Sequence, residues 1–202
     1  MNRSLKIALA ATAASLGTLM GAASADAAVT VTSVQIQDIF FGLPNNAYLQ
    51  IAELQLFSGG VNYALTGNAT ATSVYGGAGP GAANPTNAND GSTNGNYPNI
   101  YHGQANDGSD IFTLTLANAT ALQDISIYGR TDCCDARDVY KYTLLNGTDV
   151  VGTGTLDAST GNHFATAALP EPATWAMLLI GFGMIGFGMR KRSNVRTTVS
   201  YA

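Results

Sequence analysis

Short segments that alternate apolar and polar residues, with no long amphipathic helix between them, constrain the fold of this chain most. They occupy residues 34–39, 49–57, 112–116 and 125–128. Alternation with a period of two places one face of a strand in a core and the other toward solvent. Residues 139–145 run into Asn146-Gly147, which supplies the positive φ angles of a two-residue hairpin turn, and the chain continues at Val150-Val151. We therefore expect an all-β fold, an antiparallel β-sandwich.

The N-terminal residues have the pattern of a secretory signal peptide. Arg3 and Lys6 precede the apolar residues 7–14, and small residues around Ala23 and Ala27 suit a cleavage site. The apolar part is too short to span a bilayer. Residues 1–27 are therefore excluded from the fold, and we expect export through the Sec translocon into an oxidising compartment where disulfides persist.

The C-terminal residues carry a second targeting signal. Pro170-Glu171-Pro172 and Trp175 lead into the Gly-rich apolar residues 173–189, and Arg190-Lys191-Arg192 follow. Because basic residues are retained in the cytoplasm, the folded part lies on the other side of the membrane. At ~1.5 Å per residue the apolar part spans roughly 26 Å, less than a hydrocarbon core of about 30 Å, so it is a marginal anchor.

The order of these C-terminal residues resembles the PEP-CTERM sorting signal of Gram-negative bacteria that produce exopolysaccharide. The resemblance covers residues 169–192 and implies processing by an exosortase. It implies transient anchoring in the inner membrane, residues 193–202 as a cytoplasmic tail, and a final place at the cell surface or in the extracellular matrix. A permanent single-span tail is the alternative.

Residues 28–168 have the size of one domain and are long enough to bury a core. They contain few charged residues, and the whole chain has a net charge of −4 at pH 7. A mildly acidic chain does not suit nucleic acid, and a neutral ligand fits better. The sequence contains no Gly-x-Ser-x-Gly elbow, His-Glu-x-x-His helix or phosphate loop, so we expect no enzyme.

One short stretch holds both cysteines of the chain between two arginines. It runs Arg130-Thr131-Asp132-Cys133-Cys134-Asp135-Ala136-Arg137. Adjacent cysteines that pair close a small rigid ring with an exposed sulfur face, and each arginine offers a fixed fork of donors to neutral hydroxyls. The stretch therefore predicts a sugar-binding loop. Two alternatives stay open: surface ion pairs with the neighbouring aspartates, Asp138 included, and free thiols for redox chemistry or a soft metal, which an oxidising compartment disfavours.

A second candidate site lies in a long segment without periodicity, residues 75–101. A loop of this length in a compact domain is usually either functional or disordered. Within it, Asn87-Ala88-Asn89-Asp90-Gly91-Ser92 gathers hard oxygen donors around a glycine turn, which is the chemistry that calcium prefers. A string of Asx turns explains the same residues without an ion.

His102, Arg130-Thr131-Asp132 and Arg137, with the adjacent Cys133 and Cys134, resemble the fucose-binding motif of the F-type lectins. The resemblance covers about residues 48–156 and implies a discoidin-like, galactose-binding-like jelly-roll sandwich. It implies that His102, Arg130 and Arg137 hydrogen-bond the sugar and that Asp132 orients the arginines. The Cys133–Cys134 disulfide would pack on the apolar edge of the sugar.

The same resemblance gives the acidic turn a ligand hypothesis. Asn87, Asp90 and Ser92 correspond to the turn that many of these lectins use for a structural calcium ion. A strand that ends the lectin domain supplies a closing carboxylate there, whereas here the similar strand, with Ala52 and Glu53, comes first. The order is therefore circularly permuted, which a sandwich tolerates because its termini lie close together.

These observations predict an exported carbohydrate-binding protein of the cell surface or matrix, with fucose-like sugars or exopolysaccharide as its partner. The alternative is a structural protein of the exopolysaccharide or biofilm matrix that has the same fold and binds no ligand.

Overall fold

The computed structural model describes residues 29–39, 47–169, 180–187 and 190. The predicted signal peptide lies outside these residues. So do Pro170, Glu171, Pro172, Trp175 and the end of the chain from Lys191 and Arg192 onward.

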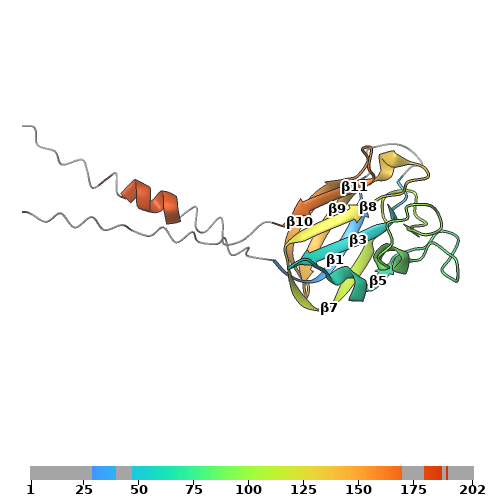
Figure 1. The fold of residues 1–202 in the computed structure, drawn as a ribbon, viewed down its shortest axis with the longest axis horizontal. Helices are drawn as coiled ribbons and strands as arrows, with labels where there is room; N and C mark the ends of the chain where they lie inside the picture. The colour runs from blue at the N-terminus through green and yellow to red at the C-terminus, as the bar shows by residue number, and fades with distance from the viewer. Residues whose placement is uncertain (1–28, 40–46, 170–179, 188–189, 191–202) are drawn as a thin grey trace, which may run out of the picture.

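Two antiparallel sheets form the domain (Figure 1). The five-stranded sheet has the order β10-β9-β1-β7-β5. Its strands are β1 (Val29–Asp38), β5 (Asn68–Ala71), β7 (Phe112–Leu122), β9 (Val139–Asn146) and β10 (Asp149–Asp157). The four-stranded sheet, β11-β8-β3-β4, contains β3 (Glu53–Ser58), β4 (Val61–Asn62), β8 (Asp124–Tyr128) and β11 (Phe164–Ala168). Smaller elements are the ladder of β2 (Gln50–Ile51) with β6 (Tyr101–His102) and the 3-10 helices η1 (Tyr63–Thr66), η2 (Pro85–Asn89) and η3 (Asp135–Arg137).

The core lies between the two sheets. Leu54 of β3 and Ile127 of β8 belong to the same buried cluster as Val34 of β1 and Leu114 of β7. Each such side chain contributes roughly 1.5–3 kcal/mol by leaving water. The alternating segments therefore bury their apolar faces against each other, and the prediction of an antiparallel β-sandwich is confirmed at this level.

The predicted hairpin is also confirmed. β9 and β10 pair on either side of the turn, with Asp149 opposite Asn146, and Gly147 has the left-handed φ of 64° that this turn requires. The predicted strand 49–57 is instead divided at Ala52. The Ala52 amide donates to the Tyr128 carbonyl (2.8 Å), so the chain changes partner there, from β6 in the ladder to β8 in the sheet.

The register of the strands fixes which loops meet at each end of the sandwich. The start of β1 pairs with the end of β7, and the end of β11 pairs with the start of β8, so both flanking segments leave from one end. The segment after β8, helix η3 and the loop 75–101 lie at the opposite end (Figure 1). The candidate binding residues therefore lie at the end of the sandwich opposite to the start of β1 and the end of β11.

Candidate functional site

His102, Arg130 and Arg137 come from three separate segments and meet at this end. His102 ends β6, Arg130 lies two residues beyond β8, and Arg137 ends η3. The charges of both arginines reach the histidine, since they add to burial in lowering the pKa of His102. The structure thus brings the three motif residues together across stretches of sequence that contain two strands.

Three tyrosines that the sequence analysis did not single out surround His102. The rings of Tyr75, Tyr48 and Tyr97 have centroids 4.6, 5.3 and 6.1 Å from its imidazole. The Arg130 guanidinium lies 5.6 Å from the Tyr97 ring centre, and that of Arg137 lies 5.1 Å from Tyr48. Each arginine is thereby held over an aromatic ring. Because the tyrosines come from distant loops, only the Tyr-rich composition hinted at them.

Tyr75 and Tyr97 are unusually open to solvent for aromatic residues, at 41% and 42% exposed. An exposed ring beside hydrogen-bond donors offers an apolar surface to a ligand that has both hydroxyls and C–H groups. The site is therefore a shallow, aromatic-walled surface with two cations.

Both ring nitrogens of His102 are engaged within the protein. Nδ1 donates to the Gly103 carbonyl (2.7 Å), which can only accept. Nε2 of the neutral ring then accepts from the Gln50 amide, 2.8 Å away. Because His102 is only 5% exposed, it lines the site with its ring, and the predicted hydrogen bond to a sugar requires Gln50 to release Nε2.

Asp132 contacts Arg130 as the motif predicts. Its carboxylate accepts from the Arg130 guanidinium at both oxygens and from the Tyr97 amide (3.3 Å). The hydrogen bond from Arg130 is the main reason that the pKa of Asp132 is lowered. The ion-pair alternative thus applies to this pair, and the same contact orients the guanidinium.

The predicted disulfide between Cys133 and Cys134 is present. Both residues are half-buried, and Cys134 has a left-handed φ of 72° where it precedes η3. The disulfide is therefore part of the turn that carries the chain from Arg130 to Arg137.

Glu53 is the most unusual acidic residue of the second candidate site. It begins β3, is fully buried, and its carboxylate accepts long hydrogen bonds from the Gly91 amide (3.2 and 3.3 Å). Gly91 adopts a φ of 88°, which brings this amide to the carboxylate. Burial raises the pKa of Glu53 to about 7, and the negative charge of Asp90 adds to the rise. Strand β3 therefore brings Glu53 to the acidic turn.

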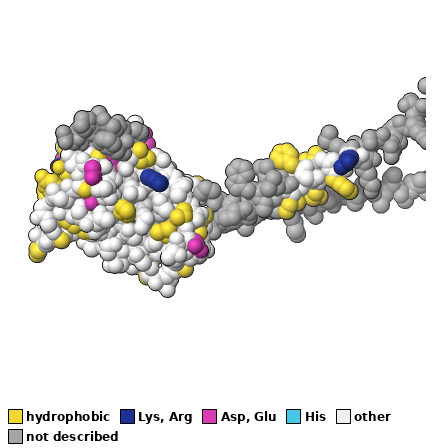
Figure 2. All heavy atoms as spheres, turned by 180° about the vertical axis from the view of Figure 1, so that it is seen from behind, with side chains coloured by type: hydrophobic (Ala, Val, Ile, Leu, Met, Phe, Trp, Pro, Cys, Tyr) yellow, Lys and Arg dark blue, Asp and Glu magenta, His cyan; other side chains and the backbone are white. Residues whose placement is uncertain are grey.

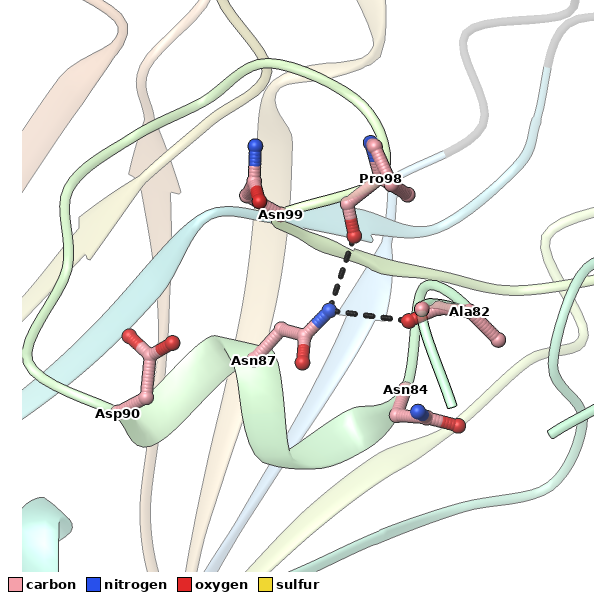
Figure 3. Close-up of a pocket in the computed structure, with 7 residues that line it drawn as sticks. Ala82, Asn84, Asn87, Asp90, Pro98 and Asn99 are labelled. Atoms are coloured by element: carbon pink, nitrogen blue, oxygen red, sulfur yellow. Dashed lines mark hydrogen bonds between the residues drawn. The ribbon is translucent and has the colours of Figure 1, made fainter. Parts of the chain in front are cut away.

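The other predicted calcium ligands, Asn87, Asp90 and Ser92, take part in hydrogen bonds within the protein. The Asn87 amide nitrogen donates to the carbonyls of Ala82 and Pro98 (Figure 3) and to that of Ile100, so it ties η2 to the loops before and after it. Asp90 Oδ1 accepts from the Ser92 amide (2.8 Å), which is the Asx turn of the alternative interpretation. Asp90 also borders a pocket of about 180 Å³ that Asn84, Asn87 and Asn99 line with amides.

The donor set suits a hard cation. The negative charge of Asp90 disfavours the ionisation of Glu53, and an ion of charge +2 between the two carboxylates would remove that cost. Within the described part of the chain, no three His, Cys, Asp or Glu residues gather. The remaining ligands would therefore be neutral oxygens, such as those of Asn87 and Ser92 and the Ala52 carbonyl.

The family model of the PEP-CTERM protein-sorting motif matches residues 168–193. This match confirms the sorting signal that the sequence predicts, and the motif implies export and processing by an exosortase. No curated protein and no solved structure matches the chain.

The apolar segment of the PEP-CTERM signal is described only in part. Residues 180–187 are helical and expose large apolar side chains, with Arg190 beyond them (Figure 2). Among the described residues no helix is long and apolar enough to cross a membrane. The predicted span, residues 173–189, falls largely outside them.

Two buried carboxylates beneath the arginines predict an unusual dependence of stability on pH. Burial raises the pKa of Asp38 to about 7 and that of Asp138 to about 6, from ordinary values of 3.8. The folded state then holds protons that the unfolded chain has released. The contribution of these two groups to the free energy of unfolding is highest below about pH 4 and falls as pH rises to about 7.

Chemical denaturation of wild type and Asp38→Asn measures this dependence of the free energy of unfolding on pH. We expect the variant to lose less stability than the wild type between about pH 4 and about pH 7. A wild-type stability that rises from pH 5 to 8 by the same amount in both proteins contradicts the prediction.

Proposed function

We propose that this protein is an exported glycan-binding protein that takes fucose-like sugars at the site of Arg130 and Arg137. The observation that carries the proposal is the pair of guanidinium groups, each held over a tyrosine whose ring contacts His102, in the stretch that contains the Cys133–Cys134 disulfide. Fixed donor forks above aromatic rings match a ligand with hydroxyls on one face and C–H groups on another.

The chemistry of binding follows from these parts. A hydrogen bond from a charged donor to a hydroxyl contributes about 1.5–3 kcal/mol, and arginine presents its donors without having to reorganise. Tyr75 or Tyr97 would cover an apolar face of the sugar, and the Cys133–Cys134 disulfide an apolar edge. Asp132 would keep Arg130 oriented while the guanidinium binds.

The finer family assignment is part of this proposal. An F-type lectin site on a galactose-binding-like jelly roll is supported by the antiparallel sandwich and by the gathering of the motif residues at one end. In the same proposal, calcium bound by Glu53, Asp90 and neutral oxygens of the turn would hold the loop 75–101 in place without touching the sugar.

The PEP-CTERM signal indicates where in the cell such a site would work. A protein anchored transiently in the inner membrane and then released outside would present its binding end away from the anchor, toward secreted polysaccharide. A shallow single site binds weakly, and many copies on one polymer would multiply the effect.

A glycan array tests the proposed function. The full chain, exported into an oxidising compartment, is purified and presented as a multivalent conjugate in calcium buffer. We expect selective binding to fucosylated glycans. Binding to another sugar alone would reject the inherited specificity, and silence across the array would overturn the proposal in favour of a structural protein of the exopolysaccharide matrix.

A further inference from the structure

Asp138, directly after Arg137, is tied to the segment that carries Arg130. The sequence suggested a surface ion pair for it, but its side chain is fully buried. Oδ1 accepts from the Arg130 amide (3.3 Å) and lies 2.9 Å from the Tyr140 hydroxyl. Oδ2 accepts from Nδ1 of His163 (3.2 Å), in the turn before β11. One carboxyl group thus connects the segment after β8, the start of β9 and the turn before β11.

The backbone is shaped to admit this carboxyl group. A Cβ atom at Gly129 would overlap the Asp138 carboxyl, so only glycine leaves room for it next to the Arg130 amide. The Gly129 amide in turn donates to the His163 carbonyl (2.8 Å), which fixes the other partner of Asp138.

The network continues from Asp138 to His102. The Tyr140 hydroxyl lies 2.7 Å from the Gln50 carbonyl as well as 2.9 Å from Asp138, and the Gln50 amide holds the His102 ring. A phenol has one proton, so Tyr140 donates to only one of these oxygens at a time. A protonated Asp138 completes the second hydrogen bond by donating to Tyr140, whereas an ionised Asp138 competes with Gln50 for the phenol proton.

We propose that Asp138 is a positioning residue of the glycan site, whose ionised carboxylate draws the segments of Arg130 and Arg137 into the geometry that binds sugar. The inference rests on the proposed function. An ionised acceptor makes the hydrogen bond from the Arg130 amide stronger than a neutral one does. The same charge attracts the Arg137 guanidinium.

The groups that face Asp138 determine the pH at which this occurs. His163 and Tyr140 favour the ionisation of Asp138 through hydrogen bonds. The charge of Asp138 in turn opposes the ionisation of Asp38 of β1, which the charge of Arg137 favours. Burial is the largest influence and places the pKa of Asp138 at about 6. Glycan binding is therefore strong above pH 7 and weakens as pH falls through 6, which is opposite to the direction of the stability change.

The test compares wild type, Asp138→Asn and Asp135→Asn in the full chain. Asparagine keeps the shape but has no charge, and exposed Asp135, which begins the 3-10 helix η3 that ends just before Asp138, serves as the matched control. For a fucosylated glycan we expect wild-type affinity to fall about fivefold from pH 8 to pH 5. At pH 8, Asp138→Asn should bind the glycan as weakly as the wild type does at pH 5, without losing stability. Asp135→Asn should behave as wild type. An Asp138→Asn variant with wild-type affinity at pH 8 overturns the proposal, as does a parallel loss of affinity and stability.

A second readout needs no sugar. With ¹⁵N-arginine labelling, the amide proton of Arg130 should shift with a midpoint near pH 6 in wild type and should not do so in Asp138→Asn. If it shifts while no glycan binds, Asp138 positions the arginines and the proposed function has failed. If it does not shift, the positioning role is wrong whatever the glycan array gives.

Discussion

Arg130→Ala and Arg137→Ala are each expected to abolish retention on a fucose column while leaving the melting temperature close to that of the wild type. Each guanidinium sits over a tyrosine, and Arg130 forms an ion pair with Asp132 of its own turn. An ion pair this near the surface contributes about 0–1 kcal/mol to stability. A lost charged hydrogen bond to a hydroxyl costs about 1.5–3 kcal/mol, or roughly 10- to 100-fold in affinity. For a weak single site that loss ends retention.

Two further variants separate the fork geometry from the charge. Arg137→Lys keeps the cation but cannot donate in a fixed plane or lie flat over Tyr48, so we expect it to elute with Arg137→Ala. Lys141→Ala removes an exposed cation from β9 and should be retained like the wild type. Retention is followed by elution volume and folding by differential scanning calorimetry. Retention of both alanine variants on the fucose column would show that the sugar does not bind at Arg130 and Arg137.

The sandwich could be predicted because its strands carry a local signal. Alternation marked the positions of β1, β3, β7 and β8, and Asn146-Gly147 marked the turn between β9 and β10. The break at Ala52 is visible in the sequence, since the apolar residues change there from odd positions, Leu49 and Ile51, to even positions, Leu54 and Leu56. The change of partner strand at this break has no local signal. It depends on the Tyr128 carbonyl, a partner far away in the sequence, and it decides that Glu53 faces the loop 75–101.

The candidate site could be predicted only where a motif fixes residue types at short spacing. The disulfide and the contact between Arg130 and Asp132 follow from neighbouring residues. Burial of Asp138 does not, because it depends on the absence of a side chain at Gly129 and on His163 from another turn. In the same way, the Gln50 amide that occupies His102 Nε2 comes from the neighbouring strand of a two-residue ladder. From the sequence, polar residues near charges are expected to be exposed. Here contacts with distant parts of the chain bury Asp138 and bring Gln50 to His102.

Calcium is expected to raise the melting temperature by roughly 5–10 °C over protein in EDTA. An ion at 100 times its dissociation constant stabilises the folded state by about 2.7 kcal/mol, and each kcal/mol is worth about 2–4 °C in a domain of this size. The physical reason is Glu53, a fully buried carboxylate beside Asp90 that accepts from backbone amides of the acidic turn. A divalent ion would supply the missing positive charge.

Glu53→Gln tests whether this carboxylate is the origin of the effect. Glutamine keeps the size and can still accept from the Gly91 amide, so the variant in EDTA should melt at or above the wild type in EDTA. It should not respond to calcium, because the charge that the ion would bind is gone. Asp149→Asn, which removes an exposed carboxylate at the start of β10, should respond as the wild type does. Identical wild-type melting curves in calcium and in EDTA would leave the turn at Asp90 as an Asx turn, and the loop 75–101 would then be held by hydrogen bonds within the protein, such as those of the Asn87 and Asn89 amides.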